Sequence, residues 1–158
     1  MQEKDKLTPA HSRASLRVWM SLAHANHAGN VHGGTILKMV DEAAALAAIK
    51  HSHKRVVTAA LDQMTFDRPV QVGDLLVVEA QVNQVWRSSM EVGVRVWAED
   101  VSSGEQEKVA VAYLTMVALS EDAKPVNVPA LELETEEDSR RAQQAETRRT
   151  HRLQPRKV

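Results

Sequence analysis

The residues best suited to chemistry lie close together, between positions 26 and 50. Residues 26–34 form a polar loop with two asparagines, Asn26 and Asn30, and it ends at the glycine pair Gly33 and Gly34. Residues 35–50 contain neither Gly nor Pro and are rich in helix formers, which predicts a long helix. Unpaired backbone N–H groups and the positive end of the helix dipole meet where the loop enters that helix. This arrangement is suited to holding an oxyanion.

Asp41 is the first candidate for a catalytic carboxylate. At about 100° per residue it shares a helix face with small apolar residues such as Ala44 and Ala48, whereas Glu42 lies on the side of Thr35. A carboxylate in such surroundings costs free energy unless it is paired or used. Spacing alone leaves open a structural role, in which a loop amide satisfies Asp41. A shift of the helix by one residue would make Glu42 the candidate instead.

The donors around this carboxylate favour activation of water at a carbonyl. The side-chain amides of Asn26 and Asn30 and the backbone amide of Gly34 supply hydrogen bonds, and no serine or thiol nucleophile signature is present. Either asparagine, taken singly, is more often a turn-forming residue. Five histidines lie between positions 24 and 53, but no pair has the helical spacing of a zinc motif. We therefore expect no metal, and a loop-ordering role for His32.

Composition narrows the class of protein. The 158 residues suffice for one domain, and the net charge of -1 gives no reason to expect a nucleic-acid or anionic-membrane partner. The absence of cysteine excludes disulfides and thiolate catalysis. Four of the first six residues are charged, and neither a signal-peptide-like run nor a membrane span follows them. The sequence predicts a cytoplasmic protein.

Hydrophobic patterning predicts an α+β fold. Strands are expected near residues 15–22, 55–64, 75–86, 90–99 and 109–119, forming an antiparallel sheet of five or six strands wrapped around the central helix. Residues 1–13 are expected to be a flexible leader, residues 14–122 the domain, and residues 123–158 a linker with a charged helix. Acidic residues begin that last helix and arginines end it, which suits the helix dipole. With few apolar positions, it is expected to be solvated or to bridge subunits.

Four segments in order, residues 26–34, 39–42, 55–58 and 66–74, carry a family resemblance. Together they resemble the hotdog-fold acyl-CoA thioesterases of the cytosolic long-chain acyl-CoA hydrolase type. The resemblance implies dimers whose sheets join edge to edge, and hexamers of three such dimers. It also implies that Asp41 works with a loop asparagine, Asn26 or Asn30. Animal members divide the two groups between tandem domains, whereas this chain carries both, so identical subunits could complete every site.

The resemblance implies hydrolysis of fatty acyl-CoA to a fatty acid and CoA. Asp41 would act as general base or nucleophile, Asn26 would position the water or carbonyl, and the Gly34 amide would stabilise the oxyanion. No cofactor is expected, because CoA belongs to the substrate. Since CoA carries phosphates, cationic side chains should line its groove. The expected substrate-binding residues are Asn30, His32, Gly33, Arg55, Thr58, Arg68, Arg87, Ser88 and Ser89. The alternative is a non-catalytic hotdog protein that binds acyl-CoA; a hotdog dehydratase is disfavoured because its catalytic histidine is not evident.

Overall fold

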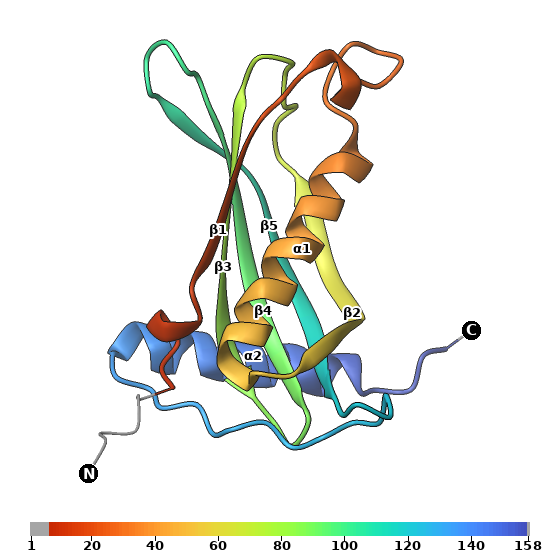
Figure 1. The fold of residues 1–158 in the computed structure, drawn as a ribbon, viewed down its shortest axis with the longest axis vertical. Helices are drawn as coiled ribbons and strands as arrows, with labels where there is room; N and C mark the ends of the chain where they lie inside the picture. The colour runs from red at the N-terminus through yellow and green to blue at the C-terminus, as the bar shows by residue number, and fades with distance from the viewer. Residues whose placement is uncertain (1–6, 158) are drawn as a thin grey trace.

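A five-stranded antiparallel sheet curves around one long helix (Figure 1). The computed structural model describes residues 7–157. The sheet order is β1-β3-β4-β5-β2, and the strands are β1 (Ala14–Trp19), β2 (Arg55–Phe66), β3 (Leu75–Val85), β4 (Ser89–Glu99) and β5 (Gln106–Leu119). The predicted α+β layout, a sheet wrapped around a central helix, is confirmed.

Helix α1 (Gly33–Ser52) packs on the inner face of the sheet. Its buried stripe includes Ile36 and Val40 and is otherwise made mainly of alanines, which let the helix lie close to the strands. Alternation supplies the opposing surface: in β4 the buried side chains of Val92, Val94 and Val96 belong to the core, and the intervening residues face the other side. The helix ends at His53, whose left-handed backbone (φ 54°) lets its N–H donate to Ile49 O at 2.8 Å.

A second helix, α2 (Glu136–Arg152), covers part of the outer face of the sheet (Figure 1). Thr135 and Asp138 form a reciprocal capping box at its start. Ala142 and Ala145 are buried, so α2 packs on the sheet and is not a purely solvated helix. The other predicted role, bridging of subunits, stays a prediction. The sequence offered few apolar positions here because two alanines and two ion pairs, Arg148 with Glu91 and Arg152 with Asp62, contribute to the contact.

The domain begins earlier than the predicted leader allows. Ser12 is buried; its hydroxyl donates to Pro9 O at 2.7 Å and accepts the Val82 N–H at 2.9 Å. Leu7 O accepts a hydrogen bond from the Glu132 N–H at 2.9 Å. Residues 7–13 are thus fixed against the domain, while the first six positions of the expected leader lie outside the described residues. Between residues 7 and 157, no helix is both long and apolar enough to cross a membrane.

Candidate active site

The loop before α1 is folded around Asn26. The side-chain oxygen of Asn26 accepts the N–H groups of Ala28 (2.9 Å) and Asn30 (3.2 Å), and its backbone N–H donates to Asn30 O at 2.7 Å. Val31 N–H donates to Val70 O at 2.8 Å and ties the loop to the segment after β2. Within residues 7–157 the Asn26 side-chain NH₂ has no hydrogen-bond acceptor. The oxygen orders the loop, and the NH₂ is left to bind another group.

His32 caps the start of α1. Its Nδ1 accepts the Gly34 N–H at 2.9 Å, which satisfies one of the unpaired donors at a helix start. The Gly34 amide expected to bind the oxyanion is therefore engaged by His32. The neighbouring Gly33 N–H has no acceptor in the described part of the chain. Sequence reasoning assigned Gly33 only to substrate binding, because the rotamer of His32 is not visible in a sequence.

Asp41 lies half-buried between α1 and β2. Thr58 Oγ1 donates a hydrogen bond to Asp41 Oδ1, and the same hydroxyl lies 3.4 Å from Met116 Sδ. No cationic side chain forms an ion pair with Asp41 between residues 7 and 157. Glu42 points to solvent, with Lys38 Nζ 4.0 Å from its carboxylate. The predicted helix phase, Asp41 inward and Glu42 outward, is confirmed.

A single chain keeps Asp41 apart from the asparagine loop. Gly33 and Asp41 are separated by about 12 Å of helix at 1.5 Å per residue. No hydrogen bond links Asn26 to Asp41 or Thr58 in residues 7–157. The pairing of Thr58 with Asp41 was not predicted, because it joins residues 17 positions apart on different elements.

The other predicted binding residues are dispersed over the domain. Arg55 begins β2 and is exposed, and Arg68 forms an exposed ion pair with Glu107 at 3.2 Å. The β3–β4 turn, with Arg87, Ser88 and Ser89, lies at the end of the sheet opposite the Asn26 loop (Figure 1). One chain does not gather these side chains into one groove. Among the described residues, no three His, Asp or Glu side chains are grouped to hold a metal ion.

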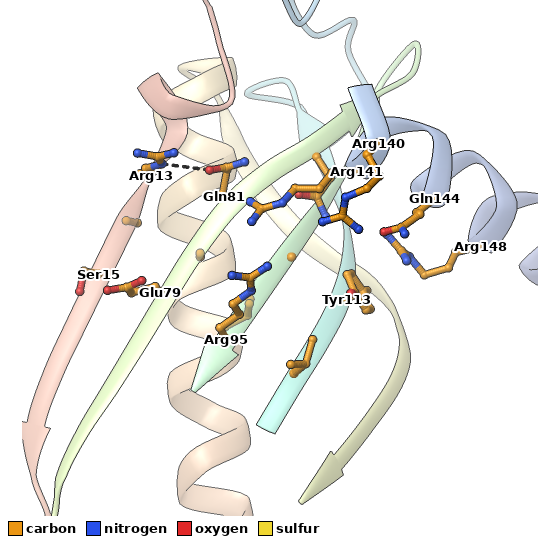
Figure 2. A pocket seen from close by; sticks show the side chains of 16 residues that line it. Arg13, Ser15, Glu79, Gln81, Arg95, Tyr113, Arg140, Arg141, Gln144 and Arg148 are labelled. Atoms are coloured by element: carbon orange, nitrogen blue, oxygen red, sulfur yellow. Dashed lines mark hydrogen bonds between the residues drawn. The ribbon is translucent and has the colours of Figure 1, made fainter. Parts of the chain in front are cut away.

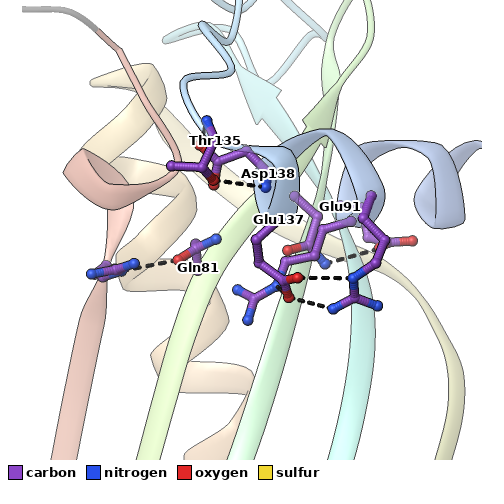
Figure 3. A network of polar contacts seen from close by, with 9 residues as sticks. Gln81, Glu91, Thr135, Glu137 and Asp138 are labelled. Carbon is purple, nitrogen blue, oxygen red and sulfur yellow. Dashed lines mark hydrogen bonds and ion pairs between the residues drawn. The ribbon is translucent and has the colours of Figure 1, made fainter.

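The most completely buried carboxylate belongs to Glu91, on the outer face of the sheet (Figure 3). Arg148 donates to it through Nε (3.0 Å) and Nη2 (2.7 Å), and Asn83 Nδ2 lies 3.2 Å away. The Arg148 guanidinium also lies 3.6 Å from the Tyr113 ring centroid. Burial acts to lower the pKa of Arg148, but hydrogen bonding to Glu91 and its negative charge raise it overall. These contacts satisfy Glu91 and give it a structural role that the sequence did not reveal.

Comparisons with known proteins show the family of this chain. Residues 28–105 match the model of the Thioesterase superfamily. An uncharacterized acyl-CoA thioester hydrolase of Bacillus subtilis is 38% identical over 113 residues, which are 72% of this chain and 66% of that protein. A hexameric acyl-CoA thioesterase solved in its apo form has a TM-score of 0.88 and 39% identity, covering 92% of this chain and 93% of its own.

An acyl-CoA hydrolase from Staphylococcus aureus, solved with butyryl-CoA, CoA and CoA disulfide, is also similar. Its TM-score is 0.85 at 33% identity, covering 92% of this chain and 88% of that one. Alanine variants of an asparagine, an aspartate and a threonine of that enzyme have been solved as well. The shared fold and the identity over most of these chains show that the chain belongs to the hotdog-fold acyl-CoA thioesterases of the Thioesterase superfamily.

Proposed function

We propose that this thioesterase hydrolyses fatty acyl-CoA to a fatty acid and CoA, with Asp41 and Asn26 as its catalytic groups. The observation that carries the proposal is a half-buried carboxylate, Asp41, that has a hydroxyl partner and, among residues 7–157, no cationic one. The alanine variants of the S. aureus enzyme replace an asparagine, an aspartate and a threonine that are 15 and 17 residues apart. Asn26, Asp41 and Thr58 have the same spacing here.

Two routes through Asp41 give the same products. As general base, the carboxylate takes a proton from water while the water oxygen attacks the thioester carbon; the C–S bond then breaks and the CoA thiolate takes up the proton. As nucleophile, the carboxylate forms an anhydride with the acyl group and releases CoA, and water then hydrolyses the anhydride. After a single turnover in ¹⁸O-water, label in Asp41 identifies the nucleophilic route, because it arises only when water attacks the Asp41 carbon of the anhydride.

The remaining polar groups have separate tasks. Thr58 holds Oδ1 of Asp41, which leaves Oδ2 directed to the reacting proton or carbon. The NH₂ of Asn26 positions the water or the carbonyl. The unpaired Gly33 N–H is a ready donor for the oxyanion, and the Gly34 N–H joins it only when His32 turns away.

A second subunit completes the site in this proposal. Strand β2 is an edge strand of the sheet, and it exposes the apolar side chains of Val57, Leu61 and Phe66. Helix α1 exposes Leu37, Leu46 and Ile49. Such surface is suited to contact with a second copy, whose Asn26 loop would then reach Asp41. The hexameric relative supports a hexamer, whose arrangement in this proposal is a trimer of such dimers.

Assembly would also gather the dispersed groups that bind CoA. Arg55 and the β3–β4 turn lie at one end of the sheet and Arg68 lies at the other, so neighbouring subunits would combine them. Asn30, His32 and Gly33 lie at the loop that would hold the thioester end. A rat relative named a cytosolic acyl coenzyme A thioester hydrolase, 31% identical over 143 residues, supports a cytoplasmic location.

Mixing two inactive variants tests the shared site. Asn26→Ala and Asp41→Ala homodimers should each be nearly inactive. After joint denaturation and refolding, random pairing makes about half of the dimers mixed, each with one intact site, so about a quarter of wild-type activity should return. The same proteins mixed without refolding should remain inactive, provided that subunits do not exchange. Mixed dimers as inactive as their parents would show that each site lies within one subunit.

The alternative, a non-catalytic acyl-CoA-binding protein, is not favoured by relatives that are hydrolases. A continuous thiol-release assay over acyl-CoAs of increasing chain length separates the two functions. Binding of acyl-CoA without thiol release by the oligomer would overturn the hydrolytic function.

A further inference from the structure

The Thr58 hydroxyl has two acceptors within reach, on different elements. It donates a hydrogen bond to Asp41 Oδ1 on α1, and Met116 Sδ on β5 lies 3.4 Å from the same oxygen. A hydroxyl carries one proton, and a carboxylate accepts it more strongly than a thioether does. The proton therefore goes to Asp41, and the sulfur is left as the second polar contact of this oxygen. Strand β5 carries none of the residues assigned to hydrolysis or to CoA binding.

Met116 contacts Thr58 from the interior of the domain. The two residues are partners in the ladder of β5 and β2. Because β2 is an edge strand, β5 is the one strand beside it in the described sheet. Side chains alternate along β5: Tyr113 extends toward α2 on the outer face (Figure 2), whereas Met116 is fully buried in the core on the inner face. An enclosed side chain thus supports an exposed one at the margin of the sheet.

The ladder of β2 and β5 is irregular directly after Thr58. Its register shifts between Thr58 and Ala60, and such irregularities change the direction of side chains and are common next to active sites. Thr58 could turn either its hydroxyl or its methyl group toward Met116. In the structure the hydroxyl takes that position, so the rotamer that contacts the sulfur is also the one that reaches Asp41.

We propose that Met116 is a positioning residue for hydrolysis and that its sulfur keeps the Thr58 hydroxyl turned toward Asp41. The inference rests on the proposed function, in which Thr58 holds Oδ1 of Asp41. Sulfur is a weak acceptor, so it contacts the hydroxyl without competing with the carboxylate for the proton. A hydrocarbon group in its place would favour the methyl group of Thr58, because it offers the hydroxyl no acceptor. Met116 is fully buried, so it acts on the reaction through Thr58.

Met116→Leu tests the role of the sulfur in the intact oligomer. Leucine keeps nearly the same volume, and the thiol-release assay measures kcat and KM. We expect kcat to fall about three- to fivefold and KM to change less than about 1.5-fold, because a positioning contact is lost and no substrate contact is. Norleucine in place of Met116 keeps the unbranched chain and replaces only the sulfur, by a methylene group, so it should cause a similar loss of kcat.

Combining Met116→Leu with Thr58→Val shows whether the sulfur acts through the hydroxyl. Thr58→Val alone should lower kcat more than Met116→Leu does, because it removes the hydroxyl itself. If Met116 acts by orienting that hydroxyl, kcat of the double variant should lie within about 1.5-fold of the Thr58→Val value. Two independent packing effects would instead multiply the two losses.

Met90→Leu is the matched control. Met90 is the partner of Met116 on β4, is also fully buried in the core, and forms no hydrogen bond to Thr58 within residues 7–157. The same substitution in the same layer should therefore change kcat less than about 1.5-fold. Urea unfolding of both leucine variants checks that they lose comparable stability, so that a difference in kcat cannot come from a looser core.

Three results would overturn the role of Met116: full kcat with norleucine at this position, an equal loss of kcat in Met90→Leu, or multiplied losses in the double variant. If Met116→Leu does not fold, the norleucine variant decides alone. An enzyme slowed by Thr58→Val but not by replacement of Met116 loses this inference and keeps the proposed hydrolysis. A wild-type oligomer that releases no thiol from any acyl-CoA loses the proposed hydrolysis and, with it, the role of Met116.

Discussion

The two faces of the sheet hold a carboxylate in opposite ways. On the inner face Asp41 accepts one hydrogen bond from the neutral Thr58 hydroxyl and has no cationic partner in the described chain. On the outer face Glu91 accepts two hydrogen bonds from Arg148 and one from Asn83. The difference teaches that burial alone does not tell a structural carboxylate from a candidate catalytic one. The fully neutralised group is suited to stabilising the fold, and the under-satisfied one keeps an oxygen free for the chemistry that we propose.

The side chains that surround the two carboxylates also differ: those near Asp41 are neutral, and those near Glu91 include a cation. Asp41 lies on α1 one turn before Ala44 and Ala45, whose side chains are short and neutral. Glu91 lies beneath a helix whose Arg148 fills the space above it and stacks on Tyr113. On the outer face the Glu91–Arg148 ion pair therefore anchors α2 to the sheet, whereas on the inner face Asp41 has no such partner covering it. Each prediction below alters one side of this contrast.

The largest expected effect is on stability, from Glu91→Gln. Removing one partner of a buried ion pair leaves the other charge uncompensated, and we expect a loss of about 3 kcal/mol in the free energy of unfolding. Urea unfolding at fixed protein concentration measures it. The double variant Glu91→Met with Arg148→Met should regain much of the loss, because no lone charge remains. A loss below about 1 kcal/mol would mean that the Glu91–Arg148 pair contributes no more to stability than an exposed surface ion pair.

Asp41→Asn should have the opposite profile. The amide keeps the shape and the Thr58 contact but cannot take a proton, so turnover should fall by a factor of about a hundred or more. Stability should change little. Thiol release and urea unfolding, measured on the same preparation, give both quantities. Retention of activity with loss of stability would make Asp41 a second structural carboxylate, and the contrast between the two faces would be lost.

Thr58 sharpens the contrast because it is the neutral partner of Asp41. Thr58→Val removes the hydroxyl at nearly constant volume, and we expect kcat to fall about tenfold with KM little changed, since a positioning hydrogen bond is lost. Thr58→Ser keeps the hydroxyl and should retain most of kcat. Equal damage from both substitutions would indicate that the methyl group, through packing, is what matters.

The sequence predicted the inner face better than the outer one. Period-two alternation placed the strands, and the 100° helical period separated Asp41 from Glu42 correctly. Both patterns depend on residues close together in the sequence, so they can be recognised without knowledge of tertiary contacts. The capping of Gly34 by His32 was missed because it depends on one side-chain rotamer.

The outer face depends on partners far apart in the chain. Glu91 and Arg148 are 57 residues apart, and Asp62 and Arg152 are 90 apart. Ser12, which fixes the start of the domain, bonds to Val82 across 70 residues. Alternation shows only that Glu91 leaves the core side of β4; it does not show that a helix will cover it. The charged C-terminal helix therefore resembles a solvated one in sequence, because the partners of its ion pairs lie far away in the chain.

The smallest effect is expected at Glu42, the neighbour of Asp41. Its side chain is 53% exposed and lies 4.0 Å from Lys38, a geometry that contributes about 0.3–0.5 kcal/mol at most. Glu42→Gln should therefore change turnover less than about twofold. The ion pair of Glu42 with Lys38 is exposed and spans one turn of α1, so it does not contact the proposed reacting groups. The same assay used for Asp41→Asn gives the comparison under identical conditions. If Glu42→Gln abolished activity while Asp41→Asn did not, the reacting carboxylate would be on the solvent side of α1, where only a second subunit could enclose it.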